Sequence, residues 1–164
     1  MPVDTYSRFV SLLAFAALAT GVIALVRPRM FAQLGFRNGV GLAALVALGS
    51  TAGSLVYSEY YLFEPCRLCW YQRIAMYPLV VTLGIGWWRS DRAVVRYVVP
   101  PAVIGGGISL WHLANQWLLT EPSCAVGASC AVRYVTEFGF VTIPFMAFSG
   151  FAAITGLLIA VRKQ

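Results

Sequence analysis

Residues 140–161 read Phe-Val-Thr-Ile-Pro-Phe-Met-Ala-Phe-Ser-Gly-Phe-Ala-Ala-Ile-Thr-Gly-Leu-Leu-Ile-Ala-Val, a run without a single charged side chain. A predominantly apolar stretch of about 20 residues is long enough to cross the hydrocarbon core of a bilayer as an α-helix. Four further runs carry at most one charge each: residues 9–26, 39–58, 70–88 and 97–118. We therefore predict five transmembrane segments.

The composition of the whole chain agrees with this prediction. Of its 164 residues, 60% are hydrophobic and 11% are charged, and the mean hydropathy is +0.77, whereas soluble domains carry about 25% charged residues. Backbone polar groups in hydrocarbon must be satisfied within each segment, and the runs show no period of two, so they predict helices rather than barrel strands. We expect an all-α integral membrane helical bundle, and we exclude a soluble enzyme and a disordered tail.

The charged residues separate into two sets of loops. Residues 27–38, 89–96 and the tail after residue 161 hold eight basic residues and one acid, whereas the opposite loops hold more acids than bases. Because Lys and Arg are retained on the cytoplasmic side, we expect the second set and the N-terminus to face outward from the cell (plasma or inner) membrane. The arginines separate apolar runs and form no clustered face, so membrane topology explains the net charge of +6 better than nucleic-acid binding does. We therefore expect membrane lipid and no nucleic acid as a partner.

The first run has an alternative interpretation as a cleaved signal peptide, because residues 17–19 (Ala-Leu-Ala) resemble a small-residue cleavage site. Against this, Asp4 offsets Arg8 before the run, while Arg27 and Arg29 follow it directly. That charge order is typical of an anchor with its N-terminus outside. We favour the retained helix.

All four cysteines lie in the two loops that are expected to face outward. Cys66 and Cys69 form a C-x-x-C pair, and Cys124 and Cys130 form a C-x5-C pair. Extracytoplasmic compartments are oxidising and permit disulfides. The chemistry of the chain is therefore predicted to lie in these two pairs.

Three interpretations of the two pairs compete. A zinc site built from four cysteines fits the C-x-x-C spacing, but zinc needs reduced thiolates and these loops face an oxidising compartment. Two structural disulfides are common in external loops, but the short C-x-x-C loop constrains the unfolded chain very little. Because this spacing is typical of redox-active pairs with a lowered thiol pKa, we favour thiol–disulfide exchange and predict no metal.

The C-x-x-C pair directly precedes the third segment. Pro65 suits a first helical turn, so we expect Cys69 at a helix N-terminus, where backbone N–H groups and the helix dipole favour a thiolate. Arg73 follows four residues later on the same helical face and is predicted to point its positive charge at that thiolate. The alternative for Arg73 is a side chain that extends to the membrane surface.

His112 is the single histidine and is predicted about 9 Å below the outer end of the fourth segment, at a depth similar to that of Arg73. A lone polar residue within a membrane segment indicates a functional site, although a histidine that bonds a neighbouring helix carbonyl is the plain alternative. With Cys69 and Arg73, and with Trp111 or Tyr77 as further candidates, it predicts a pocket for a flat, lipid-soluble electron acceptor.

Residues 64–78, Glu-Pro-Cys-Arg-Leu-Cys-Trp-Tyr-Gln-Arg-Ile-Ala-Met-Tyr-Pro, closely resemble the disulfide bond formation protein B (DsbB) family, especially its short BdbC-like branch. Residues 108–116 with their Trp-His pair, the C-x5-C pair, and residues 138–145 resemble the same branch in the same order. The resemblance extends from about residue 39 to the C-terminus. A C-x-x-C alone is a weak signal, but the long ungapped run around it is highly specific.

The resemblance implies a quinone-dependent thiol oxidase, with ubiquinone or menaquinone as cofactor, that regenerates a DsbA-like thioredoxin-fold oxidase. It implies that Cys66 and Cys69 are the pair next to the quinone, with Cys69 facing the ring. It also implies that Cys124 takes the mixed disulfide with the partner and that Cys130 exchanges with Cys66. Arg73 and His112 match residues that the family associates with the quinone.

One departure from the family is the first segment, because the usual body has four helices. We therefore predict an N-terminal helix and loop in residues 1–38 and a DsbB-like four-helix domain in residues 39–164. Two alternatives stay open. The vitamin K epoxide reductase family also links a C-x-x-C to quinones, but its loop cysteines precede that pair, and a non-enzymatic membrane scaffold would use its disulfides only as structure.

Overall fold

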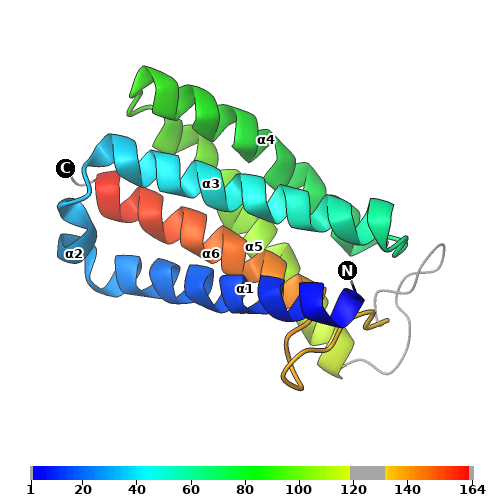
Figure 1. The fold of residues 1–164 in the computed structure, drawn as a ribbon. Helices are drawn as coiled ribbons and strands as arrows, with labels where there is room; N and C mark the ends of the chain where they lie inside the picture. The colour runs from blue at the N-terminus through cyan, green and yellow to red at the C-terminus, as the bar shows by residue number, and fades with distance from the viewer. Residues whose placement is uncertain (1, 119–131, 163–164) are drawn as a thin grey trace.

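The computed structural model describes residues 2–118 and 132–162. Five long helices lie side by side in a bundle (Figure 1), and the all-α prediction is confirmed. The helical elements are α1 (Val3–Val26), α2 (Pro28–Ala32), α3 (Phe36–Leu55), a π-helical turn η1 (Val56–Tyr60), α4 (Arg67–Arg89), α5 (Val94–Leu118) and α6 (Ile143–Arg162).

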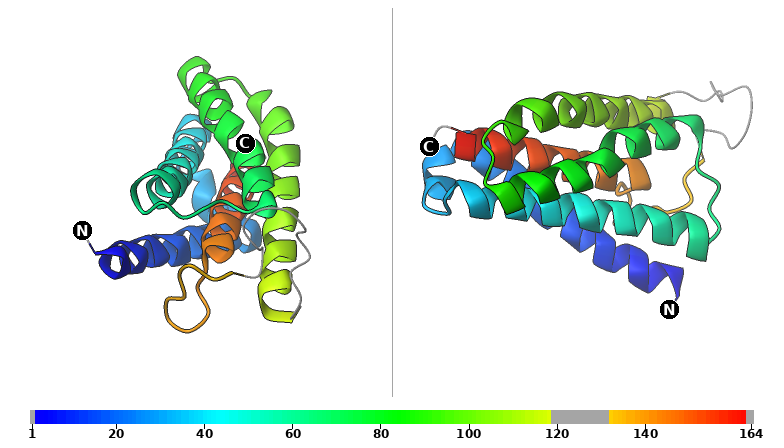
Figure 2. Two further views of the ribbon diagram at one scale, coloured as in Figure 1. Left: turned by 90° about the vertical axis from the view of Figure 1, so that its right-hand side faces the viewer. Right: turned by 90° about the horizontal axis from the view of Figure 1, so that it is seen from above.

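Within the described ranges, four helices are long and apolar enough to cross a membrane: Val3–Val26, Phe36–Tyr60, Val94–Leu118 and Ile143–Arg162. The chain is therefore a multi-pass membrane protein. Helix α4 has 23 residues, a length of about 34 Å at 1.5 Å per residue. It carries Gln72 and Arg73 and is less apolar than the other four, and it runs alongside α3 and α5 (Figures 1 and 2). Its crossing of the membrane stays a prediction.

Helix α6 begins three residues later than the apolar run that predicts it. Just before the helix, the backbone N–H of Glu137 bonds the carbonyl of Val141, and the N–H of Val141 bonds the carbonyl of Glu137, both at 2.9 Å. Gly139 allows this tight turn because its φ is +81°. The last residues of this turn are apolar like the helix, so hydropathy alone predicts a helix start at residue 140 and not at Ile143.

The connections between the helices lie at two opposite ends of the bundle. Helix α2, the α4–α5 connection and the C-terminus lie at one end, and the N-terminus, the α3–α4 connection and the segment before α6 lie at the other (Figures 1 and 2). The first end carries the basic loops of the sequence. The predicted separation of the loops into two sets is thus a feature of the fold.

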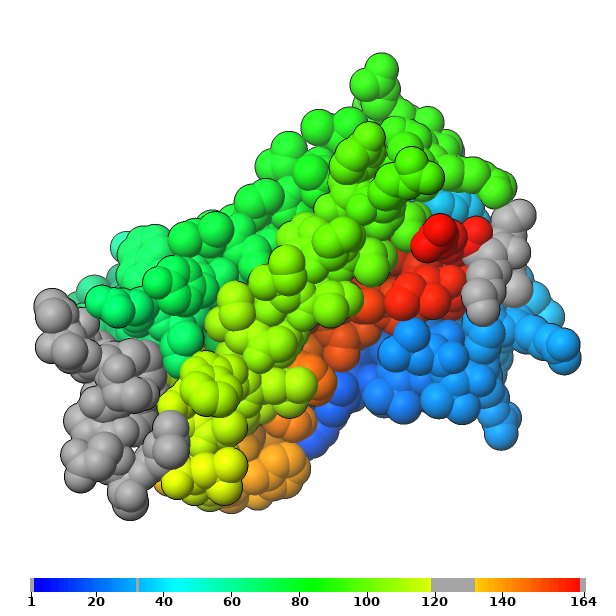
Figure 3. All heavy atoms as spheres, turned by 180° about the vertical axis from the view of Figure 1, so that it is seen from behind, coloured from blue at the N-terminus to red at the C-terminus, as the bar shows by residue number. Residues whose placement is uncertain are grey.

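Helix α6 is the centre of the bundle and packs against α1, α3 and α5. Phe151, Ile154, Leu157 and Leu158 of this helix are almost completely buried. Seen from the face opposite to Figure 1, α5 runs diagonally between α4 and α6 (Figure 3). A second apolar cluster lies near the end that carries the C-x-x-C pair and includes Ala14, Tyr57, Val135, Val141 and Met146.

Helix α1, which precedes the family-like region, packs closely on α6. A Cβ atom added to Gly21 would meet the carbonyl oxygen of Ala152 at 2.6 Å, and one added to Gly156 would overlap the backbone of Gly21. Small residues of this kind let membrane helices approach closely. At the other end of α1, the Tyr57 hydroxyl donates to Oγ of Ser7 at 3.1 Å. The first segment is thus an integral part of the bundle, whereas a domain division at residue 38 stays a prediction.

Candidate active site

The C-x-x-C pair lies at the first turn of α4. Cys66 is the N-cap residue, with φ −67° and ψ 170°, and its Sγ accepts a hydrogen bond from the backbone N–H of Cys69 at 3.4 Å. Both cysteines are free thiols, and their Sγ atoms lie 3.1 Å apart. The sequence correctly predicts that a helix starts at this pair.

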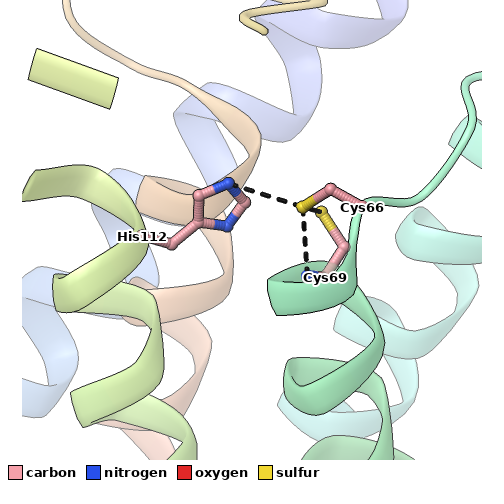
Figure 4. Close-up of side chains that lie close together, drawn as sticks. All are labelled: Cys66, Cys69 and His112. Carbon is pink, nitrogen blue, oxygen red and sulfur yellow. Dashed lines mark hydrogen bonds between the residues drawn. The ribbon is translucent and has the colours of Figure 1, made fainter. Parts of the chain in front are cut away.

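His112 of the neighbouring helix α5 faces the two cysteines at the start of α4. Its Nε2 lies 3.7 Å from Sγ of Cys66, and the three side chains converge in Figure 4. Its Nδ1 lies 3.2 Å from the side-chain nitrogen of Gln72 on α4. Cys66, Gln72 and His112 are all buried. Gln72 therefore orients the imidazole, and the imidazole contacts Cys66.

The electrostatics of the pair favour a thiolate at Cys66. The hydrogen bond with Cys69 is the largest cause that lowers the pKa of the Cys66 thiol below its ordinary value, and His112 and the backbone N–H of Cys69 add to it against the opposing effect of burial. The sequence predicts the thiolate at Cys69. That prediction is wrong for the dithiol form, because Cys66 caps the helix and accepts the backbone N–H of Cys69, while the hydrogen bond with Cys66 raises the pKa of the Cys69 thiol.

Arg73 lies one helical turn after Cys69, as predicted, but its hydrogen bonds go to α3. Its Nε donates to Oγ of Ser54 and its Nη2 to the carbonyl of Ser54, both at 3.0 Å. The guanidinium also lies 5.5 Å from the centroid of the Trp70 ring. Ser54 of α3 therefore holds the guanidinium, while the positive charge of Arg73 still acts to lower the pKa of Cys69, against the larger effects that raise it.

The sequence predicts one pocket that unites Cys69, Arg73 and His112. The structure brings Cys69 and His112 together, whereas the hydrogen bonds of Arg73 go to α3. His112 lies on the side of α4 that faces α5, where it contacts Cys66, and Arg73 lies on the side that faces α3. Trp111 is 63% exposed, and the cavity beside the thiols is lined by other residues. The hydroxyl of Tyr77 is buried and has no hydrogen-bond partner among the described residues.

A cavity of about 20 Å³ adjoins the thiols and His112. Such a volume holds one water molecule. The remaining lining residues are Gln116, Val132, Tyr134, Ile143 and Pro144. Gln116 is buried, its amide nitrogen donates to the carbonyl of Val132 at 3.2 Å, and its Oε1 has no hydrogen-bond partner within the described part of the chain. Gln72 and Gln116 are not among the residues predicted from the sequence. The available signal was an amide within an apolar run, three residues after Cys69 in one case and four residues after His112 in the other.

The second cysteine pair, Cys124 and Cys130, lies outside the described residues. The chain is described again from Val132 onward, and several contacts fix that segment beside the site. The guanidinium of Arg133 lies 4.1 Å from the centroid of the Trp117 ring, and the rings of Tyr134 and Phe63 stack with centroids 4.8 Å apart. The segment that follows the second pair is therefore held at the C-x-x-C end of the bundle.

Comparison with known proteins decides the family. Residues 36–161 match the family model of disulfide bond formation protein DsbB. The chain belongs to the DsbB family. Disulfide bond formation protein C of Bacillus subtilis (strain 168) is 46% identical over 114 residues, which cover 67% of this chain and 82% of that protein.

Two further relatives agree with this assignment to the DsbB family. Probable disulfide formation protein C 2 of Bacillus anthracis is 45% identical over 121 residues, with 73% of this chain and 86% of that protein covered. Probable disulfide formation protein of Metapseudomonas resinovorans is 41% identical over 127 residues, with 75% and 88% covered. No solved structure matches the chain. The DsbB family and these relatives support a disulfide-forming oxidoreductase, and the BdbC-like resemblance is confirmed.

Proposed function

We propose that this DsbB-family protein is a quinone-dependent thiol oxidase that reoxidises an extracytoplasmic DsbA-like thioredoxin-fold oxidase at the cell membrane. The observation that carries the proposal is the dithiol at the start of α4, where Cys66 and Cys69 lie within hydrogen-bond distance and His112 faces Cys66. A pair in which one sulfur is stabilised as a thiolate is suited to exchange, because the thiolate is the species that attacks and leaves.

Electrons pass between the two cysteine pairs by disulfide exchange in this proposal. A thiolate of the reduced partner attacks Cys124 of a Cys124–Cys130 disulfide and forms a mixed disulfide, which releases Cys130 as a thiolate. The second partner thiol then resolves the mixed disulfide. Cys130 attacks Cys66 of a Cys66–Cys69 disulfide and releases Cys69, and Cys124 resolves that second mixed disulfide so that the C-x-x-C pair ends as a dithiol.

The segment after the second pair supports exchange between Cys130 and Cys66. Val132 lines the cavity beside Cys66, and its carbonyl is held by Gln116. Cys130 precedes Val132 by two residues, and covalent geometry keeps Cα atoms two residues apart within about 7.6 Å. The position of Val132 is the support for assigning the exchange with Cys66 to Cys130.

His112 and Gln72 act on Cys66 in this proposal. When the Cys66–Cys69 disulfide is opened or re-formed, negative charge develops on sulfur, and a buried donor at 3.7 Å stabilises it. Gln72 fixes the ring orientation through Nδ1. This role replaces the sequence-based prediction that His112 binds the quinone, because the contacts of its ring lie on the Cys66 side of α4.

The residues present on the α3 side of α4 fit a quinone headgroup. Cys69, Arg73 and Tyr77 follow each other at four-residue spacing and so share one helical face, and Arg73 places this face against Ser54 of α3. Thr51 Oγ1 on α3 and the Tyr77 hydroxyl on α4 are both buried and have no hydrogen-bond partner among the described residues. The cavity beside His112, at about 20 Å³, is too small for a quinone ring.

A bound quinone, ubiquinone or menaquinone, would supply a two-electron acceptor for the dithiol. In the proposal, Cys69 and Arg73 would hold the quinone headgroup, and the guanidinium nitrogen that Ser54 does not use would be its hydrogen-bond donor. Arg73 would also stabilise negative charge on the Cys69 sulfur. The proposed orientation of the chain places both cysteine pairs on the extracytoplasmic side, where disulfides persist.

The proposal is tested by purification of the full chain in mild detergent, extraction of bound quinone, and mixing of the oxidised protein with a reduced thioredoxin-fold oxidase. We expect copurified quinone and catalytic oxidation of the partner when quinone is added. A protein that contains no quinone, and that leaves the partner reduced when quinone is supplied, would instead be the membrane scaffold with structural disulfides.

A further inference from the structure

The groups around the first turn of α4 also form a set of metal ligands. Sγ of Cys66, Sγ of Cys69 and a ring nitrogen of His112 all lie within 4.8 Å of one another. We propose that the reduced site binds one zinc ion through these three side chains and that the bound ion withholds the dithiol from disulfide exchange. Cys₂His sets that leave a fourth position open are an established way to bind zinc.

The distances between the ligand atoms suit a tetrahedral ion. Zn–S bonds of about 2.3 Å and Zn–N bonds of about 2.0 Å place two sulfurs about 3.8 Å apart and a sulfur and a nitrogen about 3.5 Å apart. Sγ of Cys66 lies 3.7 Å from Nε2 of His112, and the two Sγ atoms are 3.1 Å apart. The spacing between Cys66 and His112 is thus already in place, Cys69 lies within 4.8 Å of the ring nitrogen, and the sulfurs need to separate by less than about 1 Å.

The charge balance makes the site selective for the reduced protein. Two thiolates neutralise the charge of one Zn²⁺, so the buried cluster carries no net charge. Binding releases the remaining thiol protons to solvent and transfers no electrons. In the oxidised protein both sulfurs are joined in the disulfide and the thiolate ligands are gone. We therefore expect zinc to capture only the reduced state of the enzyme.

Gln72 is placed to support His112 as a ligand. Zinc takes the lone pair of Nε2, so the ring proton must lie on Nδ1, which faces the side-chain amide of Gln72. That amide carries both a donor and an acceptor, and a turn about its last bond presents the carbonyl oxygen to an Nδ1–H. A partner of this kind fixes the ring orientation and raises the basicity of the ligand nitrogen.

The fourth position of the ion is available as well. The cavity of about 20 Å³ is lined by all three ligand residues and by Gln116, and it has room for one water molecule. Oε1 of Gln116 is buried, and no described residue offers it a hydrogen bond. A zinc-bound water in this cavity would donate to that oxygen and satisfy it.

The test uses the full chain with Cys124→Ala and Cys130→Ala, so that Cys66 and Cys69 are its only cysteines. The protein is reduced, freed of reductant without oxygen, and titrated with Co²⁺ alone. We expect one equivalent to bind with thiolate-to-cobalt charge-transfer bands and the visible bands of a tetrahedral ion, and Zn²⁺ to displace it. The same protein with its disulfide formed gives none of these bands.

Variants separate coordination from misfolding. Cys66→Ser and His112→Ala lose the tetrahedral cobalt spectrum, whereas Leu110→Ala, at a half-exposed position on the same helix, keeps it. Gln72→Leu weakens zinc binding by about 10- to 100-fold, and Gln72→Glu restores it because a carboxylate accepts from Nδ1–H. A reduced protein that binds no cobalt, or one that gives the same spectrum in His112→Ala or in the oxidised form, overturns the proposal.

Discussion

Nε2 of His112 on α5 lies 3.7 Å from Sγ of Cys66, a residue 46 positions earlier in the chain that caps the N-terminus of α4. The contact joins two helices at the point where the C-x-x-C pair begins. It also explains why a lone histidine is buried in an apolar helix, since its ring has Cys66 on one side and Gln72 on the other.

The first prediction concerns the pH dependence of thiol reactivity. The pKa of Cys66 is lowered, so its alkylation in the reduced protein persists below the usual thiol pKa of about 8.5 and is lost as the pH falls through the lowered value. His112→Ala removes a donor, and we expect its alkylation midpoint to rise by about 1 pH unit. Peptide-resolved mass spectrometry after brief iodoacetamide treatment measures this. Equal midpoints for both proteins contradict the role given to His112.

The second prediction separates the two cysteine pairs. Cys69→Ser and Cys124→Ser each abolish quinone reduction by a reduced partner oxidase, because each breaks one of the two exchanges. Only Cys69→Ser leaves Cys124 and Cys130 able to accept electrons from the partner, which is followed by loss of partner thiols in one turnover. Quinone reduction that persists in both variants contradicts the proposed electron path.

A third prediction concerns Arg73, whose two donors bond Oγ and the carbonyl of Ser54. Lysine cannot form this bidentate contact, so its ammonium group would not be held in the position of the guanidinium. We expect Arg73→Lys to raise the KM for quinone by about tenfold, the equivalent of about 1.4 kcal/mol. The rate at which the partner reduces Cys124–Cys130 should not change. Arg67→Lys, at an exposed position on the same helix, is the matched control, and an equal effect in both variants would argue against Arg73 as a quinone-binding residue.

The fourth prediction tests the contact between α1 and α6. Gly21→Leu places a side chain against the backbone of Ala152, and overpacking of this kind costs about 1–3 kcal/mol. We expect a lower Tm in detergent, measured by the loss of helical circular dichroism. Gly49→Leu is the control, because a Cβ at Gly49 meets nothing within 4 Å. If both variants melt at the same temperature, α1 is not packed as described.

The helical architecture could be predicted from the sequence because an apolar run of sufficient length is enough to identify a membrane helix. Long apolar runs locate α1, α3, α5 and α6, and the basic loops separate from the cysteine-bearing ones without knowledge of any contact. The boundaries are less accurate where hydrogen bonds decide them. Because of the turn between Glu137 and Val141, α6 begins only at Ile143. At the end of α3, a π-helical turn continues the helix to Tyr60.

The candidate site is predicted in part. The spacing of Cys66, Cys69 and Arg73 along one helix is a local property, so their placement at the first two turns of α4 follows from the sequence. Partners on other helices do not follow from it. Ser54 holds Arg73 from α3, and His112 reaches Cys66 rather than Arg73 because α5 packs on the other side of α4. These contacts depend on helix rotation and depth, which composition does not specify.

The measurement that tests the central claim most directly is a single-turnover reaction without oxygen. Oxidised protein with bound quinone is mixed with the reduced partner oxidase, and the ultraviolet absorbance of the oxidised quinone is followed. We expect the absorbance to fall in the wild-type chain and to stay constant in the Cys66→Ala/Cys69→Ala variant, while that variant still oxidises one equivalent of partner. Quinone reduction at the wild-type rate in the double variant would contradict it.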